Sequence, residues 1–215
     1  MKLWWLADMG FAYDNVPPDK WPALRQRLID DHPLTRELIV NNTLEVFNDI
    51  LSTRIGRDGL RYVKDIKLPG DTFGVLFETL FLRRLDATRW RKGGQQDELD
   101  VVHNITPSFS FEIKTTSKRK IYGSKSVNLD PAKTNSGSYH LLVFWDLVPW
   151  PSIGYIAWGW LDRSDFTASA STYSRPLKND ARKLKCETLY RRGDVPEPAL
   201  AQILEEGGFG YAGMR

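Results

Sequence analysis

The sequence contains very little cysteine. Its 215 residues include one, Cys186, so an intramolecular disulfide framework and a four-cysteine zinc site are both excluded. Histidine is scarce as well, and no spacing among His32, His103 and His140 suggests a zinc site. A single thiol fits the reducing cytoplasm, and we therefore expect a cytoplasmic protein.

Long apolar runs and a strong charge of one sign are also missing. The apolar run at residues 3–7 is far too short for a signal or membrane segment, so we expect no membrane association. The 30 Lys and Arg residues oppose 27 Asp and Glu residues, which leaves a net charge of +3. This mild excess permits a nucleic-acid partner without requiring one, and the local distribution of charge matters more.

The apolar residues that are present suffice for one sizeable core. With 41% hydrophobic content and no internal repeat, residues 1–215 are expected to form a single domain. Apolar residues at helical spacing predict helices at residues 21–32, 34–55 and 71–85. Alternating or continuous apolar stretches predict strands at residues 99–103, 109–115, 139–145 and 155–161. The sequence therefore predicts an α/β fold with a mixed central sheet flanked by helices.

The most informative strand is the one at residues 109–115. In a strand its aromatic and aliphatic side chains share one face, while Glu112 and Lys114 lie together on the other. Turn-forming residues at 104–108 allow the preceding strand to fold back as a hairpin, which would bring Asp100 beside Glu112. Two carboxylates suit a hard cation such as Mg²⁺, and the lysine can orient or help deprotonate an attacking water. The alternative is a solvated Glu-x-Lys face with no catalytic role.

A further carboxylate, Glu78, lies within the strongly apolar predicted helix at residues 71–85. Two interpretations are open. Glu78 can be an exposed residue balanced by Arg83 and Arg84, or it can point toward Asp100 and support a metal or its water. The helical spacing does not decide between them.

The segment after the Glu-x-Lys strand is basic. From residue 112 to residue 133, six Lys or Arg residues face two acids, a local excess of +4. Lysine and arginine contact phosphates, and serine, asparagine and lysine can read base edges. The candidate DNA-binding residues are Lys118, Arg119, Lys120, Tyr122, Ser124, Lys125, Ser126 and Asn128. A solvated basic turn is the alternative.

Three other polar stretches are interpreted from their composition. Residues 86–98 are expected to form a mobile loop that can touch phosphates. Residues 162–165 form either a turn with a helix start or a DNA-contacting loop. Residues 175–192 are basic again and form either a second phosphate-binding surface or a solvated helix. His140, in a buried strand, is expected to be structural. A short helix is expected at residues 198–206.

Asp100 together with Glu112-Ile113-Lys114 resembles the PD-(D/E)xK nuclease motif, in which an aspartate and an acidic-x-Lys pair on adjoining strands bind magnesium and cut phosphodiesters. A larger resemblance, over about residues 34–185, is to the ScaI-like type II restriction endonucleases. It is carried by residues 74–80, by residues 109–128 (FSFEIKTTSKRKIYGSKSVN) and by residues 159–165 (GWLDRSD). Leu99 stands where the name of the motif places proline, a position that contributes no ligand.

The resemblance implies a restriction-endonuclease-like PD-(D/E)xK fold and a Mg²⁺-dependent homodimer that cuts both strands of double-stranded DNA at a short palindrome. It implies that Asp100 and Glu112 are metal ligands, that Lys114 is the catalytic lysine, and that Glu78 is a supporting acid. Residues 1–70 would then be a helical N-terminal part, residues 71–165 the catalytic core, and residues 166–215 a basic segment and tail.

Our interpretation of the sequence is a type II restriction endonuclease. Two alternatives stay open at this point. The same motif serves structure-selective nucleases of the repair or resolvase type. The chain could also be a catalytically silent DNA-binding module, in which the acidic pair only supports the fold.

Overall fold

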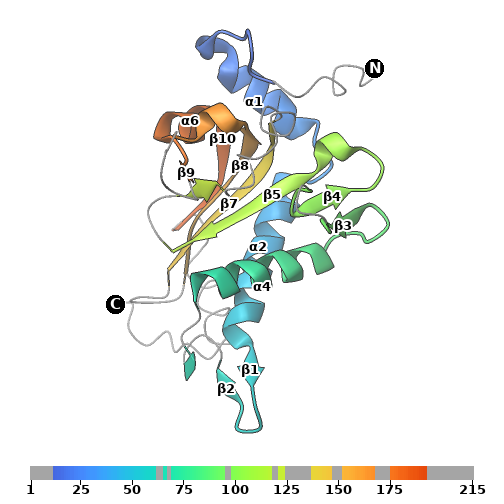
Figure 1. The fold of residues 1–215 in the computed structure, drawn as a ribbon, viewed down its shortest axis with the longest axis vertical. Helices are drawn as coiled ribbons and strands as arrows, with labels where there is room; N and C mark the ends of the chain where they lie inside the picture. Colours follow the sequence, from blue (N-terminus) through green and yellow to red (C-terminus); the bar gives the residue numbers. More distant parts are fainter. Residues whose placement is uncertain are drawn as a thin grey trace.

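The computed structural model describes residues 12–61, 65–66, 69–94, 98–117, 121–123, 137–146, 152–167 and 175–192. Its centre is a six-stranded sheet in the order β10-β8-β7-β5-β4-β3, with helices packed against it (Figure 1). The predicted α/β architecture with a mixed, helix-flanked sheet is confirmed. In this described part of the chain, no helix is long and apolar enough to cross a bilayer.

The strands of the sheet are antiparallel to their neighbours except for one pair. They are β3 (Trp90–Lys92), β4 (Val101–His103), β5 (Phe111–Thr116), β7 (Ser138–Asp146), β8 (Ser152–Leu161) and β10 (Cys186–Arg191). β5 runs parallel to β7, with Glu112 opposite His140 and Lys114 opposite Leu142. The four predicted strands all form. β5 begins two residues later than predicted because Pro107–Phe109 forms a 3₁₀ turn, η3.

The helices follow from their capping residues and apolar stripes. They are α1 (Trp21–Asp30), α2 (Arg36–Ser52), α4 (Gly70–Arg83) and the short α6 (Asn179–Lys185). α2 starts after Thr35, whose side chain accepts a hydrogen bond from the backbone N–H of Leu38. In α4, Phe73, Phe77 and Phe81 recur every four residues and are each fully buried, so one stripe of the helix faces the core.

Side chains of the sheet alternate between two faces. Phe111 and Ile113 of β5 enter the main hydrophobic core, which also contains residues of α1, α2 and α4. The opposite face carries a smaller apolar cluster that includes Leu142 of β7. Because they alternate with Phe111 and Ile113, Glu112 and Lys114 belong to this second face. The sheet therefore separates the main core from the candidate polar site.

Two short two-stranded ribbons lie outside the main sheet. β1 (Arg54–Ile55) and β2 (Leu60–Arg61) form a hairpin that projects from the end of α2 (Figure 1). Gly56 and Gly59 have φ values of +77° and +64°, which only glycine adopts readily. The predicted helix ends three residues early, at Ser52, because Arg54 and Ile55 belong to β1 instead. β6 (Tyr122–Gly123) pairs with β9 (Arg175–Pro176).

β3 corrects the expectation of a mobile loop at residues 86–98. This edge strand pairs with β4, and the buried Trp90 ring lies 4.6 Å from the His103 ring, edge to face. Arg91 forms an ion pair with Glu98 in which Nη2 and Oε1 are 2.6 Å apart. The polar composition concealed the strand because one aromatic residue anchors it while its other two side chains face solvent.

Gly159 of β8 lies against the backbone of the neighbouring chain segment at Lys185 and Cys186. A Cβ atom at this position would lie 2.2 Å from the Lys185 carbonyl oxygen, whereas one at Gly154 would meet nothing closer than the Phe144 carbonyl oxygen at 3.8 Å. We expect Gly159→Ala to lower the free energy of unfolding by about 1–3 kcal/mol, because β10 must move away from β8. Urea denaturation of Gly159→Ala beside Gly154→Ala tests this, and equal stability of the two variants would contradict it.

Candidate active site

Asp100, Glu112 and Lys114 meet at the β4–β5 hairpin. Asp100 lies just before β4, which is antiparallel to β5. One of its carboxylate oxygens accepts a hydrogen bond of 2.8 Å from the backbone N–H of Ile113 and lies 3.5 Å from Lys114 Nζ. Lys114 also donates to the carboxylate of Glu112. The structure therefore brings together the three residues that the hairpin was predicted to bring together.

Burial and the neighbouring charges shift the pKa values of Asp100 and Lys114. Burial raises the pKa of Asp100 to about 6, with a further upward contribution from the Glu112 carboxylate and an opposing one from Lys114. Burial alone would lower the pKa of Lys114, but the carboxylates of Glu112 and Asp100 outweigh it and raise that pKa above its usual range. Lys114 is therefore an ammonium group at neutral pH. This favours its role in orienting a water or phosphate oxygen over a role as the base.

Glu78 on α4 belongs to the same electrostatic group. Burial raises its pKa to about 7, and the negative charges of Asp100 and Glu112 add to the increase, whereas Lys114 and Lys92 oppose it. A carboxyl with a raised pKa beside two other acids is a common feature of functional sites. The structure thus places Glu78 near the Asp100 group.

Arg84, one of the possible charge partners of Glu78, has other partners because α4 packs on α2. Arg84 forms ion pairs with Glu45 and Asp49 of α2, so its guanidinium is engaged on the other helix. This observation favours the orientation of Glu78 toward the β4–β5 hairpin over a simple charge balance with Arg84.

Two adjacent carboxylates, Asp100 and Glu112, with a third acid on α4 close enough to interact electrostatically, suit a cation site. The raised pKa values of Asp100 and Glu78 reflect the cost of holding these carboxyls close together with little solvent. Residues that the structure describes contain no group of three or more His, Cys, Asp or Glu side chains placed to hold a metal ion. Asp100 and Glu112 would therefore supply two oxygen ligands, and water and substrate would supply the others, as is usual for Mg²⁺.

Two nearby histidines have structural roles in this geometry. The Nδ1 atom of His140 lies 2.9 Å from the Ser138 carbonyl oxygen, and burial lowers the pKa of His140 to about 4. This buried ring is therefore neutral and held by the backbone, as expected from the sequence. His103 accepts a hydrogen bond of 2.9 Å from the Thr106 N–H and points to the face opposite Asp100.

The predicted DNA-binding segment is described only in part. Lys118, Arg119, Lys120, Ser124, Lys125, Ser126 and Asn128 lie outside the described residues. The backbone of Tyr122 lies in β6, and Ile121 before it is buried in the smaller apolar cluster. Residues 121–123 therefore lie against the body of the protein, where β6 pairs with β9. The predicted helix at residues 198–206 is likewise outside the described part.

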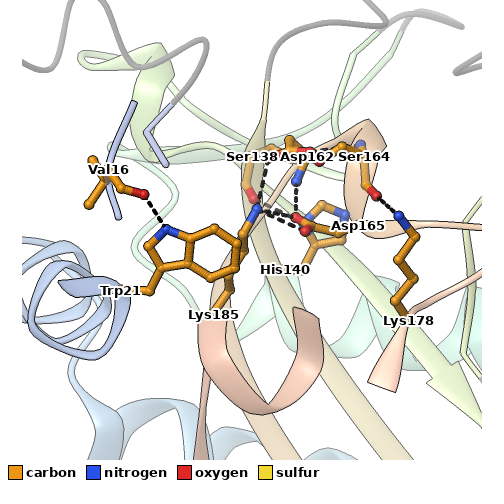
Figure 2. A network of polar contacts seen from close by, with 9 residues as sticks. All are labelled: Val16, Trp21, Ser138, His140, Asp162, Ser164, Asp165, Lys178 and Lys185. Carbon is orange, nitrogen blue, oxygen red and sulfur yellow. Dashed lines mark hydrogen bonds and ion pairs between the residues drawn. The ribbon is translucent and has the colours of Figure 1, made fainter. Parts of the chain in front are cut away.

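A buried ion cluster was not predicted from the sequence. Lys185 is 2% exposed, and its Nζ lies 3.0 Å from Asp162 Oδ2 and 2.8 Å from Asp165 Oδ1. The ammonium group also lies 4.6 Å and 5.0 Å from the ring centroids of Tyr13 and Trp21. Figure 2 shows Lys185 between the aspartates and Trp21. Residues 162–165 thus form a turn that holds a lysine. The only signal in the sequence was a pair of aspartates directly after a buried strand.

The pKa of Glu78 predicts a pH-dependent stability. Since the pKa is raised from 4.5 to about 7 in the folded protein, the protonated form is favoured and stability is lost as pH rises through 7. We expect Glu78→Gln to be more stable than the wild type at pH 8, by about 1–2 kcal/mol after allowance for solvent screening. The two proteins should become similar near pH 4.

Urea denaturation in EDTA across this pH range provides the measurement. Glu37→Gln, at an exposed position in the first turn of α2, is the control and should show no such gain between pH 4 and pH 8. A pH-independent difference between Glu78→Gln and the wild type would contradict the placement of Glu78 in the acidic group.

The sequence of the chain also matches known proteins. The sequence model of the ScaI restriction endonuclease family matches residues 11–190 of the chain. The chain is also 28% identical over 172 residues to the type II restriction enzyme ScaI of Streptomyces caespitosus. This match covers 75% of this chain and 74% of the relative. The family match includes Glu78, Asp100, Glu112 and Lys114. The mixed sheet flanked by helices is compatible with a restriction-endonuclease-like fold.

Proposed function

Because the chain belongs to the ScaI restriction endonuclease family, we propose that it is a type II site-specific deoxyribonuclease with a PD-(D/E)xK centre. It hydrolyses phosphodiesters of double-stranded DNA at a short palindrome and requires Mg²⁺. The observation that carries this proposal is the convergence of Asp100, Glu112 and Lys114 on the β4–β5 hairpin. No comparable observation favours a repair nuclease or a silent DNA-binding module.

In this proposal the acidic residues hold the cation and the lysine orients the reactants. Asp100 and Glu112 hold Mg²⁺, which when bound offsets the charge that develops on the phosphate and favours ionisation of the attacking water. Lys114, kept as an ammonium group by the adjacent carboxylates, donates a hydrogen bond to that water or to a phosphate oxygen. Glu78 adds negative charge to the cation site as a supporting acid.

Recognition is assigned to the basic segment after β5. We propose that Lys118, Arg119, Lys120, Tyr122, Ser124, Lys125, Ser126 and Asn128 contact DNA. The local excess of positive charge and the anchoring of this segment by the β6–β9 pairing support the assignment. Residues 1–215 act as one nuclease domain in the cytoplasm. Two copies form a homodimer, because the two-fold symmetry of a dimer matches that of a palindrome.

Digestion of plasmid DNA in the presence of Mg²⁺ tests the function. We expect discrete fragments, and sequencing their ends would give the recognition site. Asp100→Asn is the matched control, and it should bind DNA but leave it uncut. A smear, or cleavage of branched DNA alone, would instead indicate a structure-selective nuclease. Binding without any cleavage would indicate a silent DNA-binding module.

A further inference from the structure

A groove lined by basic side chains is separate from the β4–β5 hairpin. A groove of about 680 Å³ is formed by α6, by β8 and β10, and by parts of α1 and β7. Its lining residues are Arg25, Phe144, Gly154, Tyr155, Arg182, Lys183, Cys186, Glu187, Thr188 and Arg191. The lining therefore contains four cationic side chains and one acidic side chain.

The acidic side chain does not cancel this positive charge. Glu187 is held by Arg36, whose Nε donates to both carboxylate oxygens at 3.0 Å and 2.9 Å. Since Arg36 is not among the lining residues, the charge of Glu187 is offset from outside the groove. The groove as a whole is therefore positive and fits an anionic ligand.

Two of the arginines are held in place by groups other than acids. The guanidinium of Arg182 lies over the rings of Phe144 and Tyr155, 5.8 Å and 5.5 Å from their centroids. Arg25 donates from Nη1 to the carbonyl oxygens of Lys183 and Cys186, at 3.3 Å and 3.4 Å. Stacking and carbonyl contacts orient a guanidinium while leaving its charge to attract an anion.

The groove and the catalytic hairpin lie on the same side of the sheet. Lys114 of β5 is opposite Leu142, and Phe144 lies two residues further along β7, on the same face. Phe144 is in turn opposite Tyr155 of β8. With strands ~4.8 Å apart and ~3.3 Å per residue, the Cα atoms of Phe144 and Tyr155 lie about 8 Å and 12 Å from that of Lys114.

We propose that this groove binds the phosphate backbone of the substrate DNA, within a few nucleotides of the phosphate that is cut. The offset is short because Phe144 and Tyr155 of the groove lie on the same face of the sheet as Lys114, one and two strands away from β5. This assignment rests on the proposed nuclease function. The groove contributes affinity and register without reading the bases, because contacts to phosphates position a protein on DNA and contacts to base edges select the sequence.

Salt-dependent DNA binding tests the proposal. Fluorescence anisotropy of a labelled duplex is measured in EDTA, where no cleavage occurs, over a series of KCl concentrations. The variant Arg182→Gln/Lys183→Gln should lower the slope of log K against log[KCl] by about 0.9 for each phosphate contact that is lost. Arg83→Gln, at an exposed position at the end of α4 outside the groove, is the matched control and should keep the wild-type slope. Arg182→Lys should keep it as well, because the charge is retained.

A second experiment measures where along the DNA the groove makes its phosphate contact. Once digestion has identified the recognition site, single phosphates of that duplex are replaced by neutral methylphosphonates. A replacement within a few nucleotides of the cut should weaken binding by the wild type but not by Arg182→Gln/Lys183→Gln, since two changes to one contact are not additive. Equal weakening of both proteins at every position would overturn the assignment.

The outcomes separate this inference from the nuclease proposal. A wild type that cuts DNA while the double variant keeps the full salt slope would overturn the groove alone. An equal loss of slope in Arg83→Gln would also overturn it, because the effect would then be one of overall charge. If the wild type cuts no DNA, the nuclease proposal is overturned. A loss of slope confined to the groove variants would still support the groove as a site that binds DNA. If circular dichroism shows that the variant carrying Arg182→Gln is unfolded, the same test is made with Lys183→Gln alone, because Lys183 is exposed.

Discussion

Lys114→Met is expected to reduce the single-turnover rate of DNA cleavage by roughly 10²–10⁴-fold. Methionine keeps much of the length and apolar stem of the side chain but removes the ammonium group. That group contacts both Asp100 and Glu112, so it can donate to a water or phosphate oxygen held beside the two carboxylates. The change removes this donor and leaves the two proposed cation ligands in place.

The location of the defect distinguishes catalysis from binding. We expect Lys114→Met to bind duplex DNA in EDTA with an affinity close to that of the wild type, because the lost charge sits among carboxylates and not on the DNA-binding surface. Lys20→Met, at an exposed position before α1, serves as the control and should cleave normally. A Lys114→Met protein that folds and cleaves at the wild-type rate would contradict the assigned site.

The convergence of Asp100, Glu112 and Lys114 on the β4–β5 hairpin could be predicted from the sequence because its signals are local. Alternation of apolar and polar residues in β5 places Glu112 and Lys114 on one face whatever the tertiary structure. The turn residues between β4 and β5 then bring Asp100 within hydrogen-bonding distance of the same strand. Local periodicity and turn chemistry were sufficient for this part of the site.

The position of Glu78 required the tertiary structure. Spacing along α4 places it next to the buried phenylalanine stripe but does not show which part of the sheet lies beside that edge of the helix. The choice depends on how α4 packs on α2, where Arg84 engages Glu45 and Asp49. These residues are more than thirty positions apart in the sequence, so no local pattern connects them.

Buried polar residues were the least predictable part of the chain. His32 lies among the rings of the main core, and its two nitrogens are satisfied by the Phe109 carbonyl oxygen at 3.0 Å and the Leu34 N–H at 3.1 Å. Lys185 belongs to a basic stretch that composition assigns to the surface. Each has a buried partner from a distant part of the chain, Phe109 for His32 and the two aspartates for Lys185, and a single sequence does not reveal such partners.

Lys185→Met is expected to lower the free energy of unfolding by about 3–5 kcal/mol, as is typical when one member of a buried ion cluster is removed. The methionine would leave two aspartates close together: Asp165 is 4% exposed, and its carboxylate also accepts a hydrogen bond from the Asp162 N–H at 2.9 Å. Urea denaturation measures the loss. Lys178→Met is the matched control, since this exposed lysine contacts the same turn through the Ser164 carbonyl oxygen, and its loss should cost less than about 1 kcal/mol.

Adding Asp165→Asn to Lys185→Met identifies the cause of the instability. If Lys185→Met is unstable because Asp165 becomes an unpaired buried charge, then adding Asp165→Asn should recover part of the lost stability, whereas Asp165→Asn alone should be destabilising. The loss in Lys185→Met should also shrink in acid as the carboxyl is protonated, because burial already raises the pKa of Asp165. A stability of Lys185→Met equal to that of Lys178→Met would mean that the cluster contributes little. Because Lys185 ends α6, which carries Arg182 and Lys183, loss of the cluster should also weaken the salt dependence of DNA binding through the groove.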